Sequence, residues 1–312
     1  MNRPQLSAAL VTYAADAPGS WTTMLDTARM YDRAGVDRLV ISDHVVFGEQ
    51  LDAYGRPEIG GQRGGRQPTG PDGHWLEPMT TLSVIAGVTE RVRLATGILL
   101  AALRRPVVLA KTAATLDVLS GGRLDLGVGV GWQREEYEAA GLDFDERGRL
   151  LDHTLEVCTT LWTQRAARYQ SPDLTFDNIH MMPKPLQPGG VPIWVSGTIN
   201  ARVVSRLCRF GLRWIPWGDD ASDLEQSIPR MRDRIAAAGV APDDLEVVAN
   251  LRVFKTDDES IDVERSIEPV PQLIAAGATD LRVRLPARPP TAEAEAALRA
   301  LVAAFRAASG EH

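Results

Sequence analysis

The stretch VRLATGILLAALRRPVVLAKTAATLDVLSGGRLDLGVGVGW, residues 92–132, contains one complete strand–helix–strand unit. Its apolar, β-branched start at Val92–Ile98 predicts a strand. The run Pro106–Leu119 predicts a helix that begins at proline and ends before Gly121-Gly122. A second apolar run, Leu124–Val130, predicts the next strand. Because a helix separates the two strands, we expect them to be parallel neighbours in one sheet.

The same alternation continues in both directions along the chain. The predicted strands are Leu6–Ala14, Val36–Ser42, Val92–Ile98, Leu124–Val130, Pro192–Ser196, Arg213–Trp217, Leu245–Phe254 and Asp280–Leu285. The predicted helices are Trp21–Ala34, Glu77–Thr89, Pro106–Leu119, Arg147–Trp162, Asn200–Phe210, Asp223–Ala238, Val263–Ala276 and an alanine-rich C-terminal helix. This order predicts an α/β fold, a (β/α)8 TIM barrel; a doubly wound open sheet is the alternative.

Two segments interrupt the alternation. Residues 48–75 are rich in glycine and proline and predict a long insertion loop, placed to serve as a lid over the barrel mouth. Residues 165–191 form a second, irregular insertion. Since no repeat or linker divides the sequence, residues 1–312 are interpreted as a single TIM-barrel domain with insertion loops at its C-terminal face.

The charge of the chain argues against some classes of partner. With 34 basic and 41 acidic residues the formal net charge is -7, which does not favour nucleic acid or an anionic membrane. An anionic ligand needs local positive charge, which Arg56, Arg63, Arg66 and the pair Arg104-Arg105 offer. The N-terminal apolar run is too short for a membrane span and lacks a clear cleavage site, so a cytoplasmic location is expected.

The second predicted strand ends in Asp43-His44. The active site of a TIM barrel lies at the carboxyl ends of its strands, and histidine exchanges protons near neutral pH. His44 is therefore the candidate general acid or base, with a purely structural histidine as the competing interpretation. Since side chains alternate along a strand, Asp43 and His44 are not expected to pair with each other.

The fourth predicted strand ends in a glycine run, Gly127, Gly129 and Gly131, followed by Trp132. This GxGxG spacing is not the dinucleotide fingerprint GxGxxG, because residue 132 is tryptophan. The glycines are interpreted as bare backbone lying against a flat ligand, with a tight turn as the alternative.

The fifth predicted strand leads through Ser196-Gly197-Thr198 into a helix. Free N–H groups at a helix start suit a phosphate; plain N-capping by Thr198 or Asn200 is the alternative. No HExxH, GxSxG or P-loop motif occurs, and no metal site is expected.

Taken together, six stretches in order resemble the luciferase-like monooxygenase superfamily, on the branch of oxidoreductases that depend on coenzyme F420. They are ISDHVVFG (Ile41–Gly48), ERVRLATGILL (Glu90–Leu100), SGGRLDLGVGVGW (Ser120–Trp132), FDERGRLLDHTLEVCTTLWT (Phe144–Thr163), PKPLQPGGVPIWVSG (Pro183–Gly197) and GLRWIPWG (Gly211–Gly218).

The resemblance implies a TIM barrel that binds F420, or alternatively FMN, at its C-terminal mouth. It implies that His44 faces the cofactor ring as acid/base or ring contact, and that Gly97–Ile98 forms a bulge that often holds a non-prolyl cis peptide bond. Backbone after the fifth strand is implied to bind the cofactor phosphate. The cofactor-binding residues expected on this basis are Asp43, Gly97, Ile98, Gly129, Gly131, Trp132, Ser196, Gly197, Thr198 and Ile199.

Three positions depart from the family pattern. Trp132 stands where the F420-dependent sugar-phosphate dehydrogenases carry a catalytic glutamate, which argues against that substrate class. Ser196-Gly197 replaces two glycines of many relatives. Residues 211–214, GLRW, replace a Gly-Asp-Gly-Trp motif, which puts the usual contacts near the sixth strand in doubt.

The expected activity is hydride transfer between C5 of the deazaflavin and a small organic substrate. Two alternatives remain. One is an FMN-dependent luciferase-like monooxygenase with a separate reductase, and the other is a flavin- or deazaflavin-binding protein without turnover. The expected partner is a small-molecule substrate, and the resemblance leaves a homodimer open because the family is often dimeric.

Overall fold

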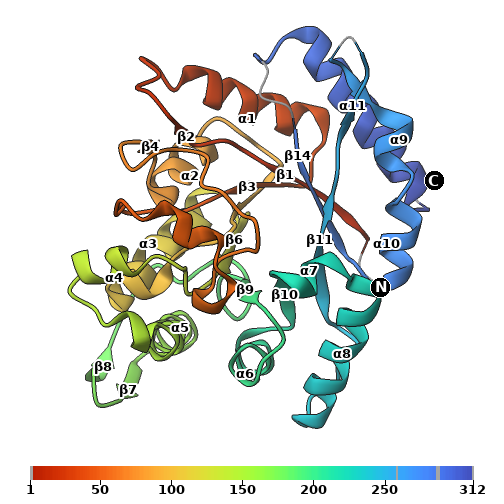
Figure 1. Cartoon of the computed structure of the whole chain (residues 1–312). Helices are drawn as coiled ribbons and strands as arrows, with labels where there is room; N and C mark the ends of the chain where they lie inside the picture. The colour runs from red at the N-terminus through yellow and green to blue at the C-terminus, as the bar shows by residue number, and fades with distance from the viewer. Residues whose placement is uncertain (1–2, 258, 286–288, 311–312) are drawn as a thin grey trace.

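Eight parallel strands close into a barrel with helices around it (Figure 1). The computed structural model describes residues 3–257, 259–285 and 289–310. The barrel strands are β1 (Gln5–Ala9), β3 (Arg38–Ile41), β5 (Arg93–Thr96), β6 (Leu124–Val128), β9 (Ile193–Gly197), β10 (Arg213–Pro216), β11 (Glu246–Leu251) and β14 (Asp280–Arg284). Because β1 pairs with both β3 and β14, the sheet has no free edge. The predicted (β/α)8 barrel is confirmed, and the open sheet is excluded.

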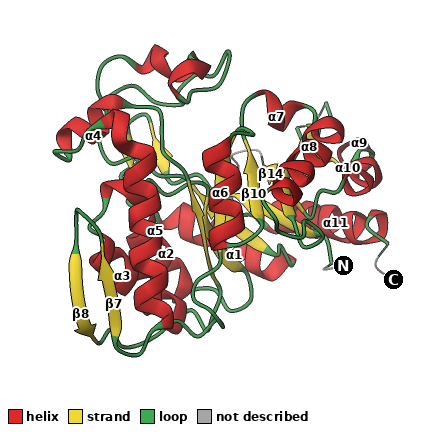
Figure 2. Cartoon of the chain, turned by 90° about the horizontal axis from the view of Figure 1, so that it is seen from below, coloured by secondary structure: helices red, strands yellow, loops and turns green. Residues whose placement is uncertain are grey.

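The helices cover the outside of the barrel (Figure 2). They are α1 (Thr22–Ala34), α2 (Pro78–Ala86), α3 (Pro106–Leu119), α5 (Arg147–Thr163), α6 (Ala201–Phe210), α8 (Leu224–Ala237), α9 (Val263–Ile267), α10 (Val270–Ala276) and α11 (Ala292–Ala308). Gly35 ends α1 with a φ of 87°, a left-handed conformation that glycine adopts without strain. The helix predicted over 263–276 is wrong as one element. It divides at Pro269, because proline lacks the N–H that a continuous helix needs.

Two strands were predicted too long, because the alternation of apolar residues continues past the barrel. β1 ends at Ala9, and β2 (Tyr13–Ala14) then pairs with β4 (His74–Trp75). Similarly, β12 (Phe254–Lys255) follows β11 as a separate strand and pairs with β13 (Ile261–Asp262). Each short strand finds a local antiparallel partner that the sequence pattern does not reveal.

The insertions also contain structure. Residues 48–75 hold β4 and two 3-10 helices, η1 (Leu51–Gly55) and η2 (Pro57–Ile59). Residues 165–191 contain a hairpin of β7 (Ala167–Gln170) and β8 (Thr175–Ile179), which projects beside α5 (Figure 2). The short elements α4 (Arg134–Ala139), α7 (Asp219–Ser222), η3 (Ala101–Leu103) and η4 (Phe144–Glu146) were not predicted, because one helical turn has no clear periodicity.

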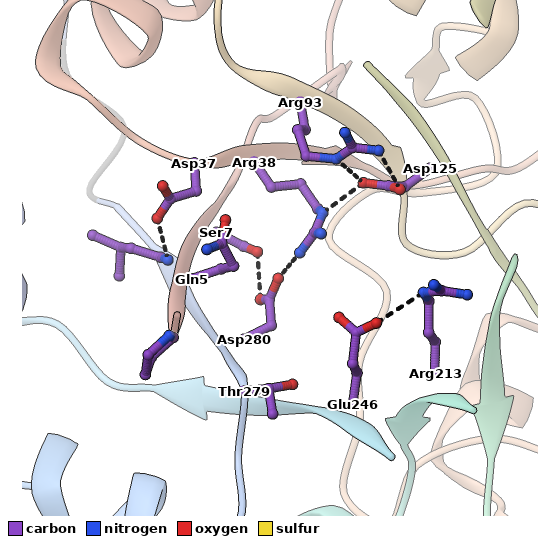
Figure 3. Close-up of polar contacts among 12 residues, drawn as sticks. Gln5, Ser7, Asp37, Arg38, Arg93, Asp125, Arg213, Glu246, Thr279 and Asp280 are labelled. Atoms are coloured by element: carbon purple, nitrogen blue, oxygen red, sulfur yellow. Dashed lines mark hydrogen bonds and ion pairs between the residues drawn. The ribbon is translucent and has the colours of Figure 1, made fainter. Parts of the chain in front are cut away.

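The amino-terminal end of the barrel is closed by ion pairs between inward-facing side chains (Figure 3). Arg38 Nε lies 2.9 Å from Asp125 Oδ2, and Arg93 Nη2 lies 2.7 Å from Asp125 Oδ1. Arg38 also pairs with Asp280, which accepts a hydrogen bond from the Ser7 hydroxyl. We call these residues the barrel floor. With the floor filled, a ligand has access only from the opposite end.

Candidate functional site

A cavity of about 1020 Å³ opens at the carboxyl ends of the barrel strands. Loops or termini of all eight strands contribute to its wall. It is lined by every cofactor or catalytic residue expected from the sequence except Ile199, namely Asp43, His44, Gly97, Ile98, Gly129, Gly131, Trp132, Ser196, Gly197 and Thr198. The topology thus brings together side chains that are up to about half the chain apart in sequence.

His44 lies in an aromatic part of this cavity. Its ring centroid is 4.5 Å from that of Phe47, 4.8 Å from that of Trp75 and 6.0 Å from that of Trp132. The imidazole Nδ1 is 3.3 Å from Glu136 Oε1, and Nε2 is 3.4 Å from Gln67 Nε2. Both ring nitrogens therefore have a polar neighbour, and the three surrounding aromatic rings restrict the orientation of the imidazole ring.

Glu136 is a site residue that the sequence reasoning missed. It comes from the short helix α4, its side chain is buried, and it accepts a hydrogen bond from the Val45 N–H at 2.8 Å. Tyr137 beside it donates to the Val130 carbonyl at 2.6 Å, which anchors α4 to the end of β6. The sequence shows a glutamate four residues after Trp132. Helix α4 is too short to give a clear periodicity, so the sequence did not indicate that this side chain would face His44.

Asp43 lines the same cavity as His44, and in the described part of the chain no hydrogen bond or ion pair joins the two side chains. It accepts hydrogen bonds from the Leu100 N–H at 2.8 Å and from Arg104 Nη1 at 2.6 Å. Arg104 also donates to Glu77 at 2.9 Å. Asp43 therefore ties the end of β3 to the loop after β5. Arg104 is occupied by two carboxylates and does not line the cavity, whereas Arg63 and Arg66 do.

The peptide bond between Gly97 and Ile98 is cis, in agreement with what the resemblance implied. The glycines of β6 lie directly against this bulge. A Cβ atom on Gly129 would stand 3.0 Å from the Ile98 side chain, and one on Gly131 would stand 2.6 Å from Leu100. Gly131 also has a φ of 71°, so the residue is needed for a turn. The backbone of Gly129 and Gly131 therefore packs against Ile98 and Leu100 on one side. The other side of this backbone lines the cavity.

The loop from Ser196 to Ile199 leads into α6, whose first N–H groups are already capped. Asn200 Oδ1 accepts from the N–H of Arg202 at 3.0 Å and of Val203 at 3.1 Å. The Ile199 N–H donates to Asp220 Oδ2 at 2.7 Å. A carboxylate thus occupies the backbone donor that was expected to bind phosphate, and Arg230 lies 3.5 Å from the same carboxyl group.

The insertion at 48–75 crosses the cavity mouth. Trp217 Nε1 lies 3.1 Å from the Gly60 carbonyl oxygen and 3.2 Å from that of Gly61. The Tyr54 ring lies 5.4 Å from the ring of Trp132. Burial raises the pKa of Tyr54, so its hydroxyl stays neutral. The insertion therefore contacts residues that follow β6 and β10, at the mouth of the cavity.

No described helix is both long and apolar enough to span a membrane. In the same part of the chain, His, Cys, Asp and Glu side chains do not gather into a group of three or more that could hold a metal ion.

A family model described as luciferase-like monooxygenase matches residues 5–309. An uncharacterised protein of Mycobacterium tuberculosis is 35% identical over 164 residues, which are 53% of this chain and 57% of that protein. The chain thus spans just over half the length of that relative. The F420-dependent glucose-6-phosphate dehydrogenase of Microbacterium testaceum is 25% identical over 248 residues, covering 78% of this chain and 67% of that enzyme.

Solved structures with the same fold include enzymes with either cofactor. An F420-dependent secondary alcohol dehydrogenase, in complex with an F420-acetone adduct, superposes with a TM-score of 0.73 at 16% identity, over 96% of this chain and 99% of that one. The oxygenating constituent of 3,6-diketocamphane monooxygenase from Pseudomonas putida, in complex with FMN, gives 0.71 at 14% identity, over 96% and 97%. At these identities the likeness establishes the fold alone.

Proposed function

The chain belongs to the luciferase-like monooxygenase family, and from this membership we propose that it is an oxidoreductase that uses coenzyme F420. The proposed reaction transfers a hydride between C5 of the deazaflavin and a small organic substrate. The observation that carries the proposal is the His44–Glu136 pair in the wall of a cavity large enough for a tricyclic cofactor.

The residues of the cavity fit a flat, anionic cofactor. Its volume lies at the upper end of the range of about 300–1,000 Å³ usual for ligand sites. Aromatic side chains from Tyr54, Trp75, Trp132 and Trp217 and the bulge at Gly97–Ile98 offer flat, apolar walls. Arg63 and Arg66 supply positive charge at the mouth for the acidic tail that distinguishes F420 from FMN.

F420 supplies the hydride chemistry when bound, and the chain supplies position, a proton site and shelter from water. His44 holds or accepts a proton at Nε2 or Nδ1, and Glu136 keeps the imidazole in one orientation. The bulge at Gly97–Ile98 would contact the cofactor ring. The backbone of Ser196–Ile199 would hold the phosphate, for which Asp220 competes at the Ile199 N–H. The 48–75 insertion excludes solvent from above.

Relatives of both kinds support a flavin-type cofactor. The dehydrogenase of Microbacterium testaceum and the secondary alcohol dehydrogenase are named as F420-dependent. The FMN complex of the Pseudomonas putida enzyme supports the second candidate, an FMN-dependent monooxygenase served by a separate reductase. We place F420 first because the cavity offers both a proton-exchanging side chain and arginines at its mouth. We further propose that the chain acts in the cytoplasm as a homodimer.

The test is a fluorescence titration of the cofactor-free protein with F420 and with FMN at equal salt. We expect F420 to bind at least about tenfold more tightly than FMN, because only F420 has a long acidic tail for Arg63 and Arg66. The double variant Arg63→Gln/Arg66→Gln should remove this preference. Arg168→Gln, an exposed arginine on the β7–β8 hairpin, is the control and should keep it. Tight FMN binding without measurable F420 binding would overturn the cofactor assignment and leave the family and fold intact.

A further inference from the structure

Arg282 projects into the interior of the barrel, one layer above the floor. Inward positions alternate along β14, so that Asp280 belongs to the floor (Figure 3), Arg282 lies above it and Arg284 lies at the mouth. Arg282 and Arg284 line the cavity. A Cβ atom on Gly97 would stand 3.0 Å from Arg282 Nη1, so the guanidinium lies next to the bulge at Gly97–Ile98.

The other inward-facing arginines near the floor are paired with carboxylates. Arg38 and Arg93 pair with Asp125, Arg38 also pairs with Asp280, and Arg213 Nε lies 3.0 Å from Glu246 Oε1 (Figure 3). These are three arginines and three acids, so the charges of this set balance. None of these acids remains to neutralise Arg282.

No hydrogen bond or ion pair joins the Arg282 side chain to any described residue, and its Nε is buried without an acceptor. Burial lowers the pKa of Arg282 to about 10, with a further contribution from Arg38, which still leaves the guanidinium charged at neutral pH. Arg282 is half-buried and its guanidinium faces the cavity, so an anion entering the cavity can reach this unpaired charge. A buried donor without a partner, such as its Nε, usually has a ligand or a functional role in native proteins.

The surroundings of Arg282 offer donors and apolar surface. The barrel interior contains a small apolar cluster of Trp194, Ile215 and Val248, with Ile98 packed against it. The indole Nε1 of Trp194 is also buried without an acceptor. Trp194 does not line the cavity, so Arg282 is the unpaired donor of this pair that a ligand in the cavity can reach.

We propose that Arg282 is the anion-binding residue at the deep end of the cavity, where its guanidinium receives an anionic oxygen of the bound ligand. The inference rests on the proposed function only in taking the cavity as the cofactor and substrate site. Two sources share this chemistry. One is the carboxylate or enolate oxygen of a substrate, and the other is the cofactor ring, whose pyrimidine edge carries negative charge in its reduced form.

The first test uses the cofactor-free protein and benzoate, a small carboxylate, with binding followed by tryptophan fluorescence. Arg282→Met removes the charge at similar length and should weaken benzoate binding by at least about tenfold. Arg282→Lys keeps the charge and should retain most of the affinity. Arg168→Met on the exposed hairpin is the control and should stay within about twofold of the wild type.

The second test compares the affinity for the oxidised and the reduced form of whichever cofactor, F420 or FMN, binds in the titration above. If the ring is the source, Arg282→Met weakens binding of the reduced form by at least about tenfold more than that of the oxidised form. If the substrate is the source, both forms bind as in the wild type and only benzoate binding is lost. Either result supports the proposal.

The proposal that Arg282 binds an anion would be overturned if the Arg282→Met variant bound benzoate and both cofactor forms as tightly as the wild type does. The melting temperature provides an independent readout. Removing an uncompensated buried charge should leave it unchanged or raise it, whereas loss of a structural arginine would lower it. If neither F420 nor FMN binds, the proposed function fails, but the benzoate titration still decides the role of Arg282.

Discussion

His44 illustrates how one side chain gains its chemistry from residues distant in sequence. Glu136 and Gln67 meet its two ring nitrogens, and Phe47, Trp75 and Trp132 enclose its ring. The residue before it, Asp43, has a separate task in joining β3 to the loop after β5. Two adjacent residues in the loop after β3 thus have different partners in the wall of one cavity.

His44→Ala should lower turnover by about 10²-fold if His44 is a general acid or base, because the proton then has no positioned carrier. The measurement is the steady-state rate with a substrate that the wild type accepts. His153→Ala, on α5 and in contact with Tyr169, is the matched control. Unchanged turnover in a folded His44→Ala protein would reduce His44 to a structural residue.

Glu136→Gln tests whether the carboxylate orients His44. The amide keeps the size and can still accept from the Val45 N–H, so we expect a stable fold and unchanged cofactor affinity. The value of kcat should fall by about tenfold, because a neutral amide stabilises the charged imidazole less well. Glu138→Gln, on the exposed side of the same helix, should not change kcat. Equal kcat in both variants would remove Glu136 from the mechanism.

At the scale of elements, the backbone N–H groups at the start of α6 already have acceptors within the protein. Asn200 caps its first N–H groups, and Asp220 from α7 takes the Ile199 N–H. Asp220→Asn should tighten the binding of inorganic phosphate and of the cofactor by about tenfold, because it removes a negative charge from the expected phosphate position. Asp219→Asn, an exposed neighbour, is the control.

Thr198→Pro addresses the same phosphate position from the donor side. Proline removes one backbone N–H, so phosphate affinity should fall while Asp220→Asn raises it. Isothermal titration with inorganic phosphate measures both variants. A complex structure with the phosphate elsewhere would end this assignment.

The 48–75 insertion contacts the ends of β6 and β10, and we predict that a bound cofactor orders it further as a lid. Trypsin cleaves after arginine unless proline follows, so Arg63 and Arg66 provide sites within the segment, whereas Arg56 precedes Pro57 and does not. Bound cofactor should slow cleavage at these sites by about tenfold. Cleavage after Arg168, on the β7–β8 hairpin, should proceed at the same rate. Equal protection of both regions, or of neither, would count against a ligand-ordered lid.

At the scale of the whole molecule, the barrel has a charged floor that stabilises it and an open mouth that carries the candidate chemistry. Burial acts to raise the pKa of Asp125, but Arg38 and Arg93 outweigh it and hold that pKa below its ordinary value. The stabilisation from Asp125 is therefore present at neutral pH and is lost only when the pH falls through this lowered pKa.

Asp125→Ala should destabilise the protein by about 3–5 kcal/mol, because it leaves the buried Arg38 and the half-buried Arg93 without their shared partner. Urea unfolding measures the change in free energy of unfolding. Asp177→Ala breaks the exposed Arg168–Asp177 pair and should cost at most about 1 kcal/mol. A loss of similar size in both variants would mean that the floor contributes no more than a surface ion pair.

The sequence by itself determined the barrel and the strand ends that form its mouth. Apolar runs, proline starts and glycine stops are local signals. They predicted the strands β3, β6 and β9 and the helices α2, α5 and α6 within a few residues. The positions of His44, Trp132 and Ser196 in one cavity then followed from the rule that parallel strands end on one face.

Tertiary structure alone decided which side chains act on these positions. Glu136 reaches His44 from the short helix α4, and Asp220 accepts from the Ile199 N–H from the short helix α7. Arg282 pairs with no acid among the residues that the structure describes, and its Nε is buried without an acceptor. Periodicity reports which face of an element is buried, but it carries no information about which distant side chain lies across the interior. Pairing of charges depends on that three-dimensional neighbourhood, so these three roles became visible only once the barrel had closed.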